Sequence, residues 1–132
     1  MILRLSSILG KGSHSTFLSN LKNSFLKKNF IKINNKDSLF NGCLHINDLN
    51  FFIEKILGTY KKSYDFINIA SYKPIKLEKI INLFKKKYKK RLVTYSTLKT
   101  PTYIVDIKKA IYKYKFKKIS SESTLKKYLE LN

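Results

Sequence analysis

Hydrophobic residues recur along the chain with two different periods. Residues 15–28 follow a helical period, because apolar side chains such as Phe17, Leu21 and Phe25 lie three or four positions apart. The same spacing predicts further helices at about 48–57, 77–88, 106–114 and 121–130. Short runs of β-branched and aromatic residues predict strands at 2–5, 43–46, 66–70 and 92–95. Strands therefore alternate with helices, which indicates an α/β arrangement and favours a parallel sheet.

The segments between these elements carry turn and cap chemistry. Residues 10–13 form a Gly-rich loop after the first strand, residues 34–38 are polar, and Asn47 suits the N-cap of the helix that follows it. The chain begins directly on the strand at 2–5, whose composition is that of a buried strand. Because parallel sheets bury both faces and need several strands, we expect these elements to be the end of a larger α/β fold.

The charge of the chain is strongly positive, with 28 basic and 8 acidic residues and a net charge of +20. This balance suggests nucleic acid or another anionic surface as a partner. Only Arg4 and Arg91 are arginines, however, and arginine is the usual reader of phosphates and bases. Lysine, isoleucine and asparagine all have AT-rich codons, so base composition explains their abundance. A lysine-rich solvent surface is the favoured interpretation, and nucleic acid is disfavoured.

Several classes of protein are excluded by composition. The 43% of hydrophobic residues is enough for a core, so general disorder is not expected. No apolar run approaches the ~20 residues that cross a bilayer, and no basic segment precedes an apolar stretch as in a secretory signal. The single cysteine excludes a disulfide framework, and His14 has no partner at metal-ligand spacing. We expect a cytoplasmic protein without metal and without membrane association.

Three segments carry a family resemblance. They are residues 4–12 (RLSSILGKG), residues 40–49 (FNGCLHINDL), and residues 66–70 (FINIA) followed by PIKLE at 74–78. Their order resembles the R-x-x-N-V-Y-G-P-G, R-D-F-V-H-V-D-D-L and y-N-I-G … s-v-x-e-l motifs of the extended short-chain dehydrogenases/reductases, the NAD-dependent epimerase/dehydratases. The tail, with DIKKA at 106–110, is similar to that family's closing segment.

This resemblance implies the C-terminal portion of a Rossmann-type doubly wound fold. Residues 1–13 would supply the last Rossmann strand and its loop. Residues 14–132 would form the substrate-binding lobe, with a strand near 66–70 returning to the sheet. The family's N-terminal half binds NAD or NADP and its C-terminal half binds a small-molecule substrate, often a nucleotide sugar. The implied chemistry is reversible hydride transfer.

The resemblance also assigns site residues. Ser7 stands where the family has an asparagine near both the nicotinamide and the substrate, and Gly10 would lie against the cofactor. Gly12 would lie against the substrate. Asn41 replaces an arginine that binds the substrate diphosphate, although an amide lacks the charged fork of that side chain. His45 matches the histidine of the strand-to-helix motif and is assigned to the substrate.

No catalytic residue is expected in this chain. Its four glycines cannot compose the Gly-rich dinucleotide loop. Tyr-x-x-x-Lys occurs at Tyr72, Tyr95 and Tyr114, but with so many lysines nearly two matches are expected by chance. The chain is therefore expected to be inactive alone and to need a separate N-terminal Rossmann half. Two alternatives are a small lysine-rich module that binds nucleic acid or an anionic surface, and a non-catalytic remnant.

Individual residues allow a functional and a structural interpretation. His45 and Asp48 could be a base and its orienting carboxylate, but a histidine held by local hydrogen bonds is favoured. Cys43 is expected to be a small core residue rather than a nucleophile. Arg4, in a strand of buried type, needs a partner, for which Asp48 is the candidate. Tyr88 continues the apolar stripe of its helix and is expected in the core.

Overall fold

The computed structural model describes residues 1–27, 30–59, 64–89, 92–96 and 102–130. Five helices are formed: α1 (Phe17–Lys27), α2 (Ile46–Thr59), α3 (Leu77–Tyr88), α4 (Lys108–Tyr114) and α5 (Ser121–Glu130). The strands are β1 (Ile2–Leu5), β2 (Ser7–Leu9), β3 (Phe30–Asn34), β4 (Leu39–Phe40), β5 (Cys43–His45), β6 (Phe66–Ile69), β7 (Ile75–Lys76) and β8 (Leu92–Ser96).

Within the described residues the strands pair two by two. The pairs β1–β6, β2–β5 and β3–β8 are parallel, and the short pair β4–β7 is antiparallel. The α/β arrangement with parallel strands predicted from the sequence is confirmed. None of the helices in the described part of the chain is long and apolar enough to cross a bilayer.

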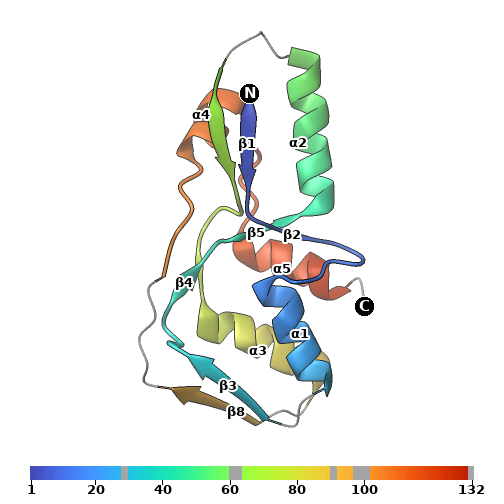
Figure 1. Cartoon of the computed structure of the whole chain (residues 1–132), viewed down its shortest axis with the longest axis vertical. Coiled ribbons are helices and arrows are strands. Elements are labelled where there is room, and N and C mark those ends of the chain that lie inside the picture. The colour runs from blue at the N-terminus through green and yellow to red at the C-terminus, as the bar shows by residue number, and fades with distance from the viewer. Residues whose placement is uncertain (28–29, 60–63, 90–91, 97–101, 131–132) are drawn as a thin grey trace.

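Two hydrophobic clusters lie on either side of the β2–β5 pair. Figure 1 shows β1, α2 and α4 at one end of the molecule and α1, α3, β3 and β8 at the other. Successive side chains of a strand point to opposite faces. Leu9 and Cys43 therefore contribute to the cluster with α1, α3 and α5, whereas Leu44 belongs to the cluster with α2, α4 and β6. The β2–β5 pair joins the two halves of the fold.

The chain changes its pairing partner at Ser6. The Ser6 N–H donates to the Ile69 carbonyl at 3.0 Å, which continues the β1–β6 ladder. The next N–H, from Ser7, donates to the Gly42 carbonyl at 3.2 Å and begins the β2–β5 ladder. The segment predicted as one strand and a loop is therefore two strands in different sheets, and β2 carries the candidate site residue Ser7.

Several expectations about the first strand are wrong. The side chains of Ile2 and Leu5, which point to opposite faces of the β1–β6 pair, are 54% and 42% exposed, so β1 is not a buried strand in the described residues. Arg4 is exposed as well, with its guanidinium 5.2 Å from the centre of the Phe66 ring. It does not pair with Asp48, whose carboxylate binds Lys127.

The predicted cap of α2 is also wrong. The helix begins at Ile46, so Asn47 lies inside its first turn. The backbone N–H of Asn47 donates to Nδ1 of His45 at 3.2 Å, and the His45 ring therefore takes the capping role. Strands β2, β3, β4 and β7 were not predicted. Tyr88 packs against the rings of Phe25 and Phe84, which confirms its place in the core.

Candidate functional site

The strand β2, the loop after it and the start of α1 form the candidate site. Ser7 lies opposite Cys43 and Leu9 opposite His45 in the parallel β2–β5 register. The loop leaves the carboxyl end of β2 at Gly10 and enters α1 at Phe17. Ligands of α/β sheets bind outside the carboxyl ends of their strands. Gly10 and Gly12 thus lie in the loop at the carboxyl end of β2, whereas Ser7 is the first residue of this strand.

The two loop glycines are required for different reasons. A Cβ on Gly10 would lie 2.8 Å from Cγ2 of Ile46, so the absence of a side chain lets the loop pack against the first residue of α2. Gly12 has no neighbour within 4 Å of an added Cβ, but its φ of +80° is left-handed. Gly12 is therefore needed for the conformation of the turn, and the space above it is open.

A hollow of about 430 Å³ opens beside this loop, and its volume lies within the usual range of ligand sites. The hydroxyls of Ser6 and Ser13 are shielded from solvent there and have no hydrogen-bond partner within the described residues. Lys11 adds a cation at the rim. The hollow can therefore accept a polar or anionic group of limited size.

The N-terminus of α1 is capped by two neighbouring side chains. The Ser19 N–H donates to Thr16 Oγ1 at 3.1 Å, and the Thr16 N–H donates to Ser19 Oγ at 2.9 Å. This is a reciprocal cap of the helix N-terminus. It holds the end of the loop in place.

His45, the last residue of β5, lies opposite Leu9 of β2 and is 4% exposed. Because Nδ1 accepts the N–H of Asn47, the proton of the neutral ring is on Nε2, which is buried without a partner in the described residues. Burial lowers the pKa of His45; Asp48 opposes this shift and Lys127 adds to it. Asp48 binds Lys127 rather than the ring, so the favoured interpretation of a locally held histidine is confirmed.

Asn41 is 2% exposed and its amide is used inside the protein. Nδ2 donates to the carbonyls of Ser71 at 3.2 Å and Val105 at 2.9 Å, and Oδ1 accepts the Val105 N–H at 2.9 Å. Both amide hydrogens are thus bound to backbone. The structure does not bring this side chain into the hollow beside Gly12, and its contacts join the start of β5 to two distant segments.

Cys43 is fully buried on β5, as expected of a core residue. Burial raises the pKa of its thiol to about 11, against a weaker opposite effect of Ser71, whose hydroxyl lies 3.4 Å from Sγ. A thiol of this pKa is not a nucleophile at neutral pH. The exposed ring of His14 contacts the Gly12 carbonyl through Nδ1 at 3.2 Å.

The Tyr-x-x-x-Lys matches do not form a site in the described residues. In the match Tyr114/Lys118, the Tyr114 hydroxyl donates to the carboxylate of Asp65. Lys118 lies over the rings of Tyr72 and Tyr112 instead. Lys99, the partner of Tyr95, lies outside the described residues. No group of three His, Cys, Asp or Glu side chains that could hold a metal occurs in the part of the chain that the structure describes.

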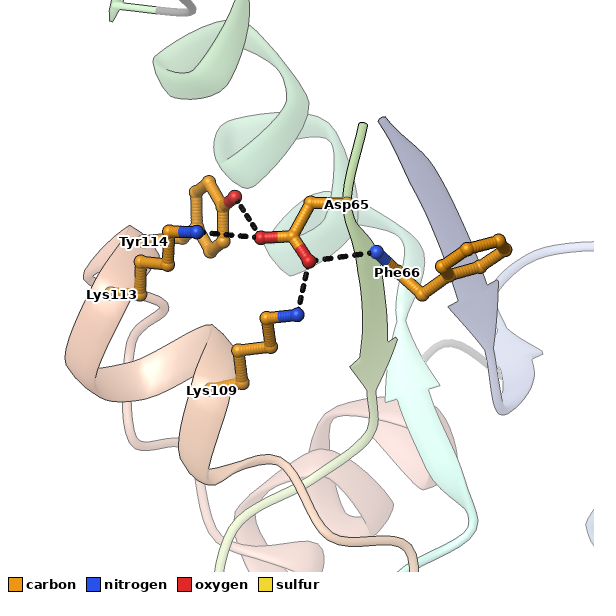
Figure 2. Close-up of polar contacts among 5 residues, drawn as sticks. All are labelled: Asp65, Phe66, Lys109, Lys113 and Tyr114. Carbon is orange, nitrogen blue, oxygen red and sulfur yellow. Dashed lines mark hydrogen bonds and ion pairs between the residues drawn. The ribbon is translucent and has the colours of Figure 1, made fainter. Parts of the chain in front are cut away.

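Sequence reasoning missed one cluster, around Asp65. Figure 2 shows its carboxylate, 8% exposed, bound by Lys109, Lys113 and Tyr114 of α4 and by the N–H of Phe66. These contacts lower the pKa of Asp65, the Lys109 hydrogen bond most. The four-residue spacing of the two lysines, which places them on one helix face, was the available signal.

Comparison with known proteins gives a match at the level of fold. No protein-family model and no curated protein matches the sequence. Among solved structures, the Helicobacter pylori ADP-L-glycero-D-manno-heptose-6-epimerase matches 97% of this chain with a TM-score of 0.73 and 18% identity. The Thermotoga maritima UDP-glucose 4-epimerase, solved with UDP-glucose, matches 98% with a TM-score of 0.69 and 20% identity.

A UDP-glucuronic acid 4-epimerase variant from Bacillus cereus, solved with a UDP-sugar analogue and NAD, matches 98% of this chain with a TM-score of 0.74 and 19% identity. This chain spans only 42–44% of the length of these three proteins. The α/β structure is therefore similar to part of the fold of NAD-dependent epimerase/dehydratases, and the resemblance read from the sequence is confirmed at that level.

Proposed function

We propose that this chain is the C-terminal, substrate-binding portion of an NAD(P)-dependent epimerase, dehydratase or reductase that acts on a sugar nucleotide or a similar substrate. The observation that carries the proposal is the extent of the fold match. At least 97% of this chain is covered by nucleotide-sugar epimerases, whose own chains are more than twice as long. The sequence motifs at residues 4–12 and 40–49 support the same assignment independently.

Within this proposal, Gly10 and Gly12 are the residues that reach a ligand, because they lie in the loop after β2 and line the open hollow. Ser7 begins β2 and is not among the lining residues, so its contact with cofactor and substrate stays a prediction of the resemblance. Asn41 and His45 support the site instead of contacting the ligand: Asn41 holds the start of β5, and His45 holds the start of α2. The diphosphate of a sugar nucleotide would then depend on loop donors and Lys11 rather than on Asn41.

The cofactor fits these residues only in part. The hollow of about 430 Å³, with Lys11 in its lining, suits one anionic end of a dinucleotide, not the whole molecule. NAD or NADP would accept and return a hydride. The glycines of this sequence do not form a dinucleotide loop, so the remaining contacts and the catalytic tyrosine and lysine belong to another α/β half.

The β1–β6 pair offers a surface for that half. In the described residues, β1 has β6 as its one strand partner, which leaves its second edge open. The uncovered face carries Ile2 and Phe66, both more than half exposed. On the other side, an apolar hollow of about 270 Å³ lies between Leu3 and Leu57. Parallel sheets are buried on both faces. A partner that adds a parallel strand to β1 would therefore complete the sheet that β1 and β6 begin.

The test is a titration of the isotopically labelled chain with UDP-glucose, followed by amide chemical shifts. We expect weak binding that moves the amides of residues 6–16, and Gly12→Ala should weaken it because it disturbs the left-handed turn. Gly58→Ala is the matched control, since Gly58 also has open space around it but no left-handed φ. The absence of shifts at residues 6–16 at millimolar ligand would refute the proposed site.

The same titration distinguishes the two alternatives. A nucleic-acid-binding module would bind an oligonucleotide more tightly than UDP-glucose, with an affinity that falls steeply as salt rises. A non-catalytic remnant would show no shifts at the loop with either ligand, and an uncovered sheet would favour its aggregation. Either pattern would replace the proposed function.

A further inference from the structure

A second groove lies between α2 and the segment 115–119, and it shares no lining residue with the hollow beside Gly12. Its volume is about 480 Å³. Phe52 of α2 and Phe116 line it and are almost completely buried, with their rings edge to face and their centres 4.9 Å apart. Ile119 completes this buried apolar lining. The groove therefore has a rigid apolar floor.

Three exposed lysines border this floor: Lys55 from α2, and Lys115 and Lys117 from the segment after α4. None of the three forms an ion pair within the described residues. Asp48 is the one carboxylate that lines the groove, and Lys127 binds it at 3.1 Å. The charge of Asp48 is thus already compensated, and the rim has an excess of positive charge.

One hydrogen bond joins the two sides of the groove. Nζ of Lys55 donates to the Lys115 carbonyl at 3.3 Å, which joins α2 to the opposite wall. Lys115 has a left-handed backbone with φ of 55°, and the N–H groups of Lys115 and Phe116 both donate to the Ala110 carbonyl. Lys115 therefore projects from a backbone held in place by the end of α4 and Lys55 from the helix α2, which reduces the ordering that a ligand would have to impose.

An aromatic ring stands at the rim. Phe51 lies one helical turn before Lys55, lines the groove and is 62% exposed. An exposed phenylalanine beside ammonium groups that form no ion pair in the described residues suits a ligand that has both a planar ring and phosphates. We propose that this groove binds a nucleoside phosphate, with the base against Phe51 and the phosphates among Lys55, Lys115 and Lys117. This site is separate from the proposed substrate site.

The test is calorimetric titration of the intact chain with ADP and with inorganic pyrophosphate at one fixed, moderate salt concentration. The double variant Lys55→Gln/Lys117→Gln should raise the dissociation constant of ADP about tenfold, as expected for the loss of two charged contacts. Lys32→Gln/Lys86→Gln is the matched control: both lysines are exposed, lie outside the groove lining and remove the same net charge. It should change the constant less than about twofold.

A single variant separates stacking from charge. Phe51→Leu should raise the dissociation constant of ADP about fivefold and leave that of pyrophosphate unchanged. Equal weakening by the two lysine double variants would show that the net charge alone attracts anions, and it would overturn the proposal. A groove variant that leaves the dissociation constant of ADP unchanged would also overturn the proposal, and so would the absence of ADP binding to the wild type. UDP-glucose shifts at residues 6–16 should persist in all these variants, so the two sites can fail independently.

Discussion

The Tyr114 hydroxyl lies 2.5 Å from Oδ2 of Asp65, although 49 positions separate the two residues. Tyr114 closes α4, and Asp65 directly precedes β6. The backbone carbonyl of Asp65 also accepts the N–H of Ile2 at 2.7 Å. One aspartate therefore connects α4 to the beginning of the β1–β6 pair, on the β6 side of β1 and away from its open edge (Figure 2).

We expect Asp65→Asn to lower the melting temperature by several degrees at pH 7, because an amide cannot balance the charges of Lys109 and Lys113. The contacts lower the pKa of Asp65 from its ordinary value of 3.8, so the folded state binds the proton less tightly than the unfolded state. Their stabilising effect is complete above about pH 4 to 5 and is lost as the pH falls further. The variant should therefore be less sensitive to acid than the wild type.

Thermal unfolding followed by circular dichroism at pH 7 and at pH 3 measures both effects. Asp37→Asn is the control, since Asp37 forms one ion pair with Lys76 and is 63% exposed. Exposed ion pairs contribute little. A loss of stability in Asp37→Asn as large as in Asp65→Asn would contradict the special role of Asp65.

The two glycines with open surroundings should respond to alanine in opposite directions. Gly12→Ala forces an L side chain into a φ of +80° and should cost about 1 kcal/mol. Gly58→Ala, near the end of α2, should gain about 0.5–1 kcal/mol, because alanine favours the helix. Urea unfolding of both variants gives the two free energies. No loss of stability in Gly12→Ala would show that the backbone at Gly12 does not require glycine.

Gly10 should be limited by space instead of by backbone conformation. Gly10→Ala would place Cβ 2.8 Å from Cγ2 of Ile46, and overpacking of this kind costs about 1–3 kcal/mol. Ile46→Ala removes the contacting atom, so Gly10→Ala should cost much less in that background. A double-mutant cycle by urea unfolding measures this coupling. Additive effects would show that the loop and α2 do not pack as described.

The sequence predicted the five helices and four of the strands because their periodicity is local. β3 alternates between exposed and buried residues, with Ile31 and Ile33 buried, and this pattern could have predicted it. The separate strand β2, which begins directly after Ser6, could not have been predicted. It depends on pairing with Ile69 and Gly42, which are distant in the sequence.

The motif resemblance assigned Ser7, Gly10 and Gly12 to one strand and the loop after it. In the structure Ser7 begins β2 and the two glycines lie in the loop that follows, and the ligand contacts of all three stay predictions. The motif did not indicate that the Asn41 amide would be used by Val105 and Ser71, since the spacing between these segments carries no periodic signal. The capping role of His45 was also hidden, because Asn47 has the stronger intrinsic cap preference.

His45 should make the stability of the fold depend on pH near neutrality. Burial lowers its pKa from the ordinary value of 6.5, so the unfolded state binds a proton more readily than the folded state. Stability should be highest above pH 6.5 and should fall as the pH drops below it, because a proton on Nδ1 would oppose the N–H of Asn47. His45→Asn keeps an acceptor for this N–H but does not titrate.

Urea unfolding between about pH 7 and 5 measures how the free energy of unfolding changes with pH. This change should be smaller in His45→Asn than in the wild type, whereas exposed His14→Asn should keep the wild-type pH dependence. An unchanged pH dependence in His45→Asn would assign this dependence to other groups.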